Sequence, residues 1–318
     1  MSDLIWTGSL NDAYAVGGHV GLYDTTLRDG EQTVGVVLDP DEKLEIARLL
    51  DELGVDRIEA GFPRVSDDDW QAVERIAAAG LRAEIWGFSR AVPADLEALV
   101  QLGVRHSVIE SPISDLKLDA IGVSRDKMLD RITAAMRFAA DHGIHAAFFG
   151  VATASAVAAV RAGASYVHGT INGMGERAGN ANLGEVALTL RALYGVETNL
   201  RLDLIREVSA RVRELSGYDL EPWKPVTGET LYRRESGAVA SQFHDPQSIE
   251  PYSSELVATG RSIVLGKKSG LDSIRIKAEE LGLDVPEERR AELLAAVKKL
   301  GAEQRRLVTD EEFRALVG

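Results

Sequence analysis

A repeated pattern in the first half of the chain constrains the fold more than any other feature. Five times, an amphipathic segment ends in glycine, an apolar residue follows, and a short β-rich run begins soon after. The glycines are Gly54, Gly80, Gly103, Gly143 and Gly163. Glycine suits the left-handed position at which a helix ends and the chain turns back. With a first strand at Val20–Asp24, the pattern predicts six strands before residue 175.

Alternating strands and helices indicate an α/β fold with a parallel sheet and right-handed crossovers. Such a sheet is either open and doubly wound or closed into a barrel, and both forms bind ligands at the carboxyl ends of their strands. Beyond residue 182 the pattern changes: a helix is expected over Leu188–Leu215, followed by a loop-rich arm over Tyr218–Gly260. Three short helices are then expected, at Asp272–Leu281, Glu287–Leu300 and Thr309–Val317.

Charge and composition exclude several classes of protein. The chain of 318 residues has 36 basic and 50 acidic side chains, a net charge of -14, which disfavours binding to nucleic acid or to an anionic membrane. It has no cysteine, which excludes disulfides, thiolate metal ligands and a cysteine nucleophile. Its first residues lack the pattern of a secretory signal, and no run of about 18 apolar residues occurs. These features predict a cytoplasmic protein.

Two polar clusters follow predicted strands. Asp24–Gln32 (DTTLRDGEQ) would place carboxylates and an arginine at the end of the first strand, as a metal ligand and an anion clamp. The alternative is a solvated turn with its own salt bridge. Gly169–Asn180 (GTINGMGERAGN) follows the last strand, and its glycines would let backbone N–H groups approach a phosphate or carboxylate. The alternative there is a structural turn.

These clusters and Ile58–Pro63 (IEAGFP) resemble the three signatures of the 2-isopropylmalate, homocitrate and citramalate synthases, metal-dependent TIM-barrel enzymes of amino-acid biosynthesis related to HMG-CoA lyase. Glu235–Gly237 and Leu265–Gly270 are similar to segments that follow the barrel in that family. The resemblance implies an acyltransferase that performs a Claisen-type condensation. Acetyl-CoA would lose a methyl proton, the enolate would attack the ketone of a 2-oxo acid on a divalent metal (Mg, Mn or Zn), and the thioester would be hydrolysed. A homodimer is also implied.

The resemblance also assigns roles to individual residues. The implied catalytic residues are Arg28, Glu59 and Gln32. The implied substrate-binding residues are Thr170, Gly173, Gly175 and Arg177. The implied metal ligands are Asp29 and Asn180, with His168 as a further candidate. Three alternatives stay open. Glu59 could be a strand-end carboxylate paired with Arg28, Asn180 could be a helix N-cap, and His168 could be a core histidine whose hydrogen bonds are satisfied.

The chain departs from this family chiefly in one metal-binding motif and in length. The family's His-x-His metal pair is missing, since no two of the six histidines are separated by one residue. Residues 19–190 supply about 172 positions for a barrel that usually takes about 250. We therefore expect residues 1–190 to form an incomplete barrel of about six βα units that lacks about two units near residue 150. Residues 191–260 would form the helical linker and arm, and residues 261–318 a small helical subdomain.

These departures leave two other functions open beside the synthase. One is an inactive, internally deleted relative that acts as a binding or assembly protein. The other is a carbon–carbon lyase on the same barrel. HMG-CoA lyase relies on a cysteine in its glycine-rich loop, and this chain has none.

Overall fold

The computed structural model describes the whole chain except residues 1–3, 6–16, 113–114, 148–152 and 177. The chain forms two compact units. The sheet unit comprises Ser9–Leu220, and the C-terminal unit comprises Glu221–Gly318 with Met1–Gly8. Every candidate site residue lies in the sheet unit.

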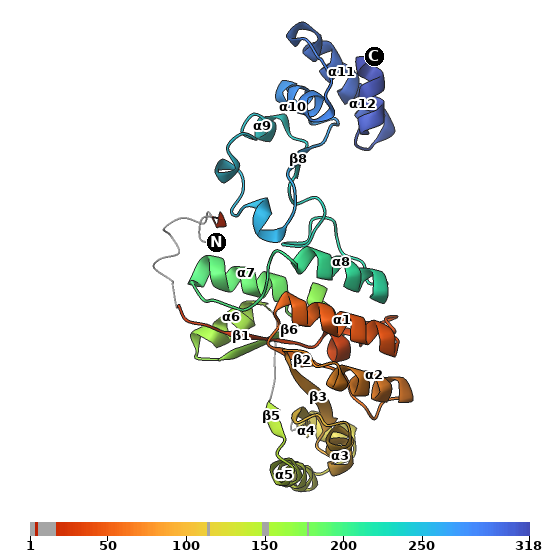
Figure 1. Cartoon of the computed structure of the whole chain (residues 1–318), viewed down its shortest axis with the longest axis vertical. Helices are drawn as coiled ribbons and strands as arrows, with labels where there is room; N and C mark the ends of the chain where they lie inside the picture. Colours follow the sequence, from red (N-terminus) through yellow and green to blue (C-terminus); the bar gives the residue numbers. More distant parts are fainter. Residues whose placement is uncertain (1–3, 6–16, 113–114, 148–152, 177) are drawn as a thin grey trace. The chain divides into compact units, whose positions relative to one another are not determined.

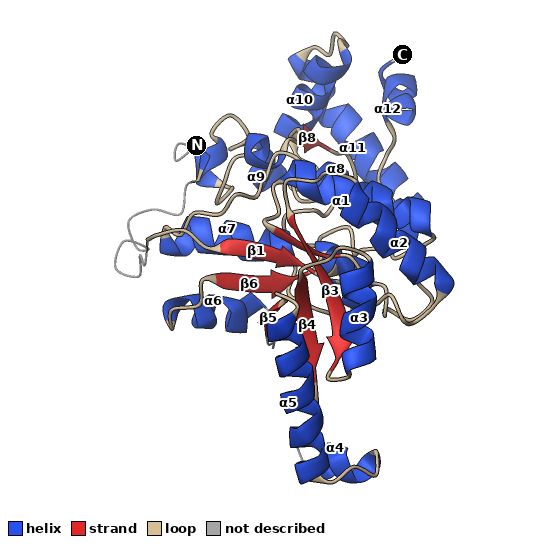
Figure 2. Cartoon of the chain, turned by 60° about the horizontal axis from the view of Figure 1, so that its bottom comes forward, coloured by secondary structure: helices blue, strands red, loops and turns tan. Residues whose placement is uncertain are grey.

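Six parallel strands form the sheet of this unit, in the order β5-β4-β3-β2-β1-β6 (Figures 1 and 2). The strands are β1 (Gly21–Asp24), β2 (Arg57–Glu59), β3 (Glu84–Arg90), β4 (His106–Glu110), β5 (His145–Ala147) and β6 (Tyr166–Gly169). The first five strands pair with their neighbours in sequence, whereas β6 returns to pair with β1. Strands β5 and β6 are therefore the two edges of an open, TIM-barrel-type sheet, which confirms the predicted fold class.

Helices alternate with the strands. They are α1 (Pro40–Leu53), α2 (Asp67–Ala78), α3 (Pro93–Gln101), α4 (Asp115–Ala120), α5 (Arg125–Asp141), α6 (Thr153–Arg161), α7 (Leu183–Tyr194) and α8 (Ile205–Ser216). The single helix expected over Leu188–Leu215 is wrong in detail, because Gly195 ends α7 in a left-handed conformation and α8 begins ten residues later.

Helix α1 shows how local sequence sets these boundaries. The Asp39 side chain accepts hydrogen bonds from the N–H groups of Asp41 (2.9 Å) and Glu42 (2.8 Å), and the Glu42 side chain accepts one from Asp39 N–H (2.9 Å). This reciprocal cap satisfies N–H groups that lack a partner within the helix. At the other end Gly54 has φ 88°, which favours glycine.

Strand alternation divides the side chains between the two faces of the sheet. On the inner, concave face, Tyr23, Trp86, Phe88 and Val108 form one buried cluster. On the outer face, Ile109 packs with residues of α3 and α5. The register pairs Tyr23 with His168 and Glu59 with Trp86, so these side chains belong to the inner face as well.

Edge strand β6 has contacts across this inner face in addition to its pairing with β1. The guanidinium of Arg57 lies 3.6 Å from the ring centre of Tyr166 and 4.9 Å from that of Trp86. Glu84 forms an ion pair with Arg57 (2.8 Å) and accepts a hydrogen bond from the Trp86 indole (2.7 Å). These contacts join β6 to β2 and β3 at the amino ends of the strands.

The C-terminal unit contains helices and one small sheet. Strands β7 (Arg233–Arg234) and β8 (Ser262–Ile263) pair in parallel, and the helices are α9 (Gly237–Ala240), α10 (Leu271–Leu281), α11 (Glu287–Gln304) and α12 (Asp310–Val317). Its core includes Ile274, Val297 and Phe313. The predicted helical C-terminal region is confirmed. Within the described part of the chain, no helix is both long and apolar enough to cross a membrane.

Candidate active site

Five of the residues singled out in the sequence meet at the carboxyl ends of β1, β2 and β6. Arg28 and Asp29 lie in a π-helical turn, Thr26–Gly30, directly after β1. Glu59 ends β2, His168 lies on β6, and Asn180 lies in the loop after β6. In a parallel sheet of this class the carboxyl ends are where ligands bind.

The turn after β1 is fixed by its own polar side chains. Buried Asp24 accepts hydrogen bonds from the N–H (2.8 Å) and the hydroxyl (2.8 Å) of Thr26. The Thr26 hydroxyl oxygen in turn accepts a hydrogen bond from Ile171 N–H (2.8 Å), which ties the turn to the loop after β6. Burial raises the pKa of Asp24 to about 7, although the hydrogen bonds from Thr26 oppose the shift. This turn sets where Arg28 and Asp29 point.

Arg28 lies between two carboxylates. Its Nε donates to Glu59 Oε1 at 2.5 Å, and its Nη1 donates to Asp29 Oδ1 at 3.0 Å. The Glu59 side chain is fully buried, and that of Arg28 is 13% exposed. Burial alone would raise the pKa of Glu59, but His168 and the charge of Arg28 outweigh it and lower the pKa to about 2. Glu59 is therefore ionised at neutral pH, and the pairing with Arg28 that was left open as the alternative for this residue is observed.

His168 and Tyr23 complete the surroundings of Glu59. The Tyr23 hydroxyl donates to Glu59 Oε2 at 3.1 Å, and Nε2 of His168 lies 3.6 Å from the same oxygen. The rings of Tyr23 and His168 are 4.4 Å apart between centres. Burial lowers the pKa of His168, against the opposing effect of Glu59, so the imidazole is neutral at neutral pH. The strand register thus points His168 inward, toward the candidate site.

Asn180 joins the loop after β6 to Asp29. Its Nδ2 donates to Asp29 Oδ2 at 2.6 Å and to the carbonyl oxygen of Met174 at 2.8 Å. Both partners are acceptors, which fixes the orientation of the amide, with nitrogen toward Asp29. A Cβ at Gly175, whose φ is 148°, would collide with this side chain. The N-cap of α7 is Asn182 and not Asn180, so the helix-cap alternative for Asn180 is wrong.

The other predicted residues lie in the same loops but contribute differently. Gln32 is exposed, and its N–H donates to Asp29 O at 3.2 Å. Thr170 is buried and donates its hydroxyl proton to Met174 O at 2.8 Å. The carbonyl of Gly173 accepts from Asn180 N–H at 2.9 Å. Thr170 and Gly173 thus shape the loop in this structure. Arg177 lies outside the described residues.

Two residues near the site were not singled out in the sequence. Tyr23 belongs to an apolar strand, and its hydroxyl contact with Glu59 depends on the strand register. Lys43 is almost fully buried, with its Nζ 2.5 Å from Glu31 Oε2 and 2.6 Å from Asp69 Oδ1. In the sequence, its burial could have been inferred from its position one turn before Ile46, on the apolar face of α1. Lys43 joins the loop after β1, through Glu31, and the first turn of α2, through Asp69, to that helix.

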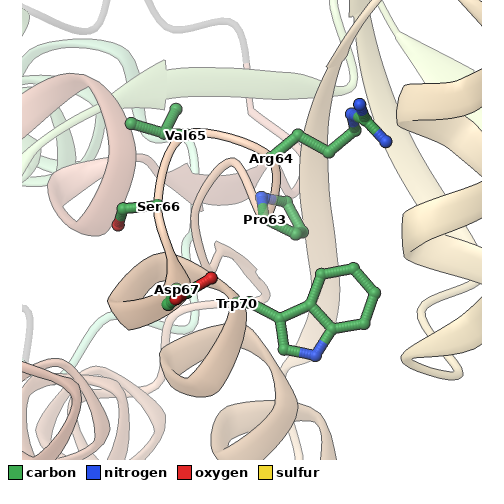
Figure 3. A pocket seen from close by; sticks show the side chains of 6 residues that line it. All are labelled: Pro63, Arg64, Val65, Ser66, Asp67 and Trp70. Carbon is green, nitrogen blue, oxygen red and sulfur yellow. The ribbon is translucent and has the colours of Figure 1, made fainter.

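A shallow pocket of about 290 Å³ lies in the loop between β2 and α2, at the same end of the sheet. It is lined by Pro63, Arg64, Val65, Ser66, Asp67 and Trp70. Figure 3 shows Arg64 and Trp70 on one side of the loop and Val65 on the other. Arg64 pairs with the buried carboxylate of Asp95 at 3.2 Å. The pocket carries an arginine and an acidic residue, so its charge does not select one class of ligand.

The donor atoms at this site do not fit a divalent metal. Both oxygens of Asp29 are engaged, one by Arg28 and one by the amide nitrogen of Asn180. Magnesium and manganese need several oxygen ligands and zinc usually three protein ligands. Among the residues that the structure describes, no group of three or more histidine or carboxylate side chains is placed to hold a metal ion.

Comparison with known proteins gives a consistent result. The family model described as HMGL-like matches residues 19–149 and 147–212. Homocitrate synthase AksA from Methanopyrus kandleri is 37% identical, over 93% of this chain and 91% of that protein. The 2-isopropylmalate synthase of Methanocaldococcus jannaschii is 34% identical, over 94% of this chain and 71% of that protein. A hydroxymethylglutaryl-CoA lyase structure from Pseudomonas aeruginosa superposes with a TM-score of 0.52 at 14% identity, covering 64% of this chain and 95% of that one.

The same comparisons locate a difference in length. The alignment with the Methanopyrus protein spans 362 positions. It includes 93% of the 318 residues of this chain, which is about 296 residues. About 66 aligned positions therefore have no counterpart in this chain. The two matched segments of the family model meet at residues 147–149. That junction begins at Ala147, the last residue of β5, which is one of the two edges of the sheet.

Proposed function

The chain belongs to the HMGL-like family, and from its similarity to the homocitrate and 2-isopropylmalate synthases we propose that it condenses acetyl-CoA with a 2-oxo acid. The observation that carries this proposal is the cluster of Arg28, Glu59 and Asn180 at the carboxyl ends of the strands, where the family signatures lie. A homodimer is proposed on the same resemblance.

The proposed reaction needs a cation near the oxygens that acquire negative charge. A proton leaves the methyl group of acetyl-CoA, the enolate carbon attacks the keto carbon of the 2-oxo acid, and the resulting alkoxide takes up a proton. Water then cleaves the thioester to give a carboxylate and free coenzyme A. Arg28 would stabilise the developing alkoxide, because a fixed guanidinium in a partly buried site needs little reorganisation. Glu59 would hold Arg28 in position, and the loop containing Thr170, Gly173 and Gly175 would contact the substrate.

The resemblance also assigns Asp29, Asn180 and His168 to a divalent metal, magnesium, manganese or zinc. When bound in such a site, a metal polarises the keto group. The donor atoms of the residues that the structure describes do not form that site, and no step of the proposed reaction is assigned to a metal.

The proposed condensation can be tested by measuring the free thiol of the coenzyme A that it releases. Purified protein is mixed with acetyl-CoA and a panel of 2-oxo acids with aliphatic or carboxylate side chains, and free thiol is measured over time. We expect release with at least one 2-oxo acid and loss of release in Arg28→Gln. The matched control is Arg82→Gln, which removes an exposed arginine just before the amino end of β3. Thiol release that continues unchanged in Arg28→Gln would contradict the role of Arg28.

A second candidate function is supported by the difference in length. We propose that the positions without counterpart correspond to two βα units between β5 and α6, a stretch that includes the family's His-x-His pair. A relative without those units would be inactive and act as a binding or assembly protein. Absence of thiol release with every 2-oxo acid, from protein that is folded by circular dichroism, would favour this candidate.

A further inference from the structure

We propose that Arg28 takes the place of the divalent cation in this site, so that the two carboxylates beside it are neutralised by a guanidinium and the site binds no divalent metal. This inference rests on the proposed function only in taking this cluster as the active site, and it does not require the proposed reaction.

The first observation is that each carboxylate oxygen around Arg28 already has a donor or a close polar neighbour. Glu59 accepts from Arg28 through Oε1 (2.5 Å) and from Tyr23 through Oε2 (3.1 Å), with His168 at 3.6 Å. Asp29 accepts from Arg28 through Oδ1 (3.0 Å) and from Asn180 through Oδ2 (2.6 Å). A metal at either carboxylate would have to share its oxygens with these donors and lie beside the guanidinium of Arg28.

The second observation concerns charge. Two carboxylates close together in a partly buried site repel each other and need a positive charge between them. Arg28 supplies it, because its Nε contacts one carboxylate and its Nη1 the other. Its side chain is 13% exposed, so water screens these contacts only in part. A dication placed between the same two carboxylates would also face the repulsion of the guanidinium.

The third observation is the orientation of Asn180. An asparagine that binds a metal presents its amide oxygen, because the nitrogen has no lone pair to give. Here the nitrogen faces Asp29 and also donates to the carbonyl of Met174. Turning the amide around would set its oxygen against those two acceptors. The loop after β6 is thus fastened to Asp29 by a hydrogen bond that needs no ion.

The test is a titration with Mn²⁺ followed by electron paramagnetic resonance, which counts free ions and needs no enzymatic activity. Four proteins are compared: wild type, Arg28→Gln, Arg28→Lys and Arg82→Gln. We expect no saturable binding to wild type, Arg28→Lys or Arg82→Gln up to about 1 mM Mn²⁺. In Arg28→Gln the carboxylates lose their cation, and we expect Mn²⁺ affinity to rise at least about tenfold. Arg28→Lys keeps the positive charge but lacks the planar guanidinium, so it distinguishes the effect of the charge from that of the side-chain shape.

Three results would overturn the inference. One is stoichiometric Mn²⁺ binding to wild type below about 100 µM that disappears in Asp29→Asn, a range in which metal sites with several carboxylates bind. Another is a folded Arg28→Gln protein with no gain in affinity, since some other group would then keep the metal out. The third is an increase in the thermal midpoint of wild type with Mn²⁺ that EDTA reverses. This last measurement needs no variant, so it decides the question even where Arg28→Gln does not fold.

Thiol release measured with EDTA and with added Mn²⁺ separates this inference from the proposed function. Release that requires Mn²⁺ would overturn the inference and leave the condensation standing. No release under either condition would remove the condensation, and the Mn²⁺ titration would still decide the inference. Equal release under both conditions would support both.

Discussion

The buried carboxylate of Glu59 gives a prediction whose size follows from the site. Folding lowers its pKa from 4.5 to about 2, and each pKa unit corresponds to about 1.4 kcal/mol, so ionised Glu59 stabilises the fold by about 3 kcal/mol. This contribution is complete above pH 4.5, the ordinary pKa in the unfolded chain, and disappears as the pH falls toward 2. Glu59→Gln should therefore lower the free energy of unfolding by about 3 kcal/mol at pH 7, because Arg28 is left without a buried partner.

The assay is urea unfolding of wild type and Glu59→Gln between about pH 3 and pH 7. Unfolding is followed by hydrogen exchange of the amides in β1, β2 and β6, so that the measured transition is that of the sheet unit. The two proteins should differ by about 3 kcal/mol at pH 7 and by much less near pH 3, since wild type has by then lost most of the contribution. Glu52→Gln, on the exposed side of α1, is the matched control and should stay within about 0.5 kcal/mol of wild type. Unfolding of Glu59→Gln at the same urea concentration as wild type at pH 7, or a difference that is constant with pH, would contradict this role of Glu59.

Three further substitutions test other parts of the sheet unit. Lys43→Met leaves the carboxylates of Glu31 and Asp69 without their shared cation, and we expect it to lower the free energy of unfolding by about 3 kcal/mol, measured in urea. Asp39→Ala removes the side-chain cap of α1 and should cost about 1 kcal/mol in the same assay; no change would mean that the cap is not needed. Folding raises the pKa of Asp24 from 3.8 to about 7, so its carboxyl group favours folding below pH 3.8 and that contribution is lost as the pH rises through about 7. Asp24→Asn should remove this loss, so the free energy of unfolding of the variant should change less than that of wild type between about pH 4 and pH 8. If wild type and variant have the same pH profile, Asp24 is not the source of the pH dependence.

The order of the elements could be predicted from the sequence because helix ends and strand patterns are local signals. The glycine after each helix and the capped start of α1 at Asp39 depend on neighbours within four residues. The boundary between α7 and α8 was missed, since the apolar residues on both sides of the break continue one helical pattern. Gly195 alone marks the end of α7, and glycine also occurs inside helices.

The site could be predicted in part for the same reason. Arg28 and Asp29 are neighbours in one motif, and their pairing needs only a short turn. The direction of His168, by contrast, depends on the pairing of β6 with β1, and a shift of one residue would reverse it. The buried position of Lys43 depends on Asp69, 26 residues away and on another helix. Such long-range partners cannot be seen in a local pattern.

The return of β6 to β1 also determines when the site is completed during synthesis. Thr26 and Ile171, which join the two loops, are 145 residues apart. At about 5–20 residues per second, a ribosome needs about 7–30 s to make that stretch. Arg28 and Glu59 can pair early, because they are 31 residues apart. His168 and Asn180 arrive only after the rest of the sheet has left the ribosome. Until then one side of β1 has no neighbouring strand, and an unpaired strand edge of this kind can pair with another chain.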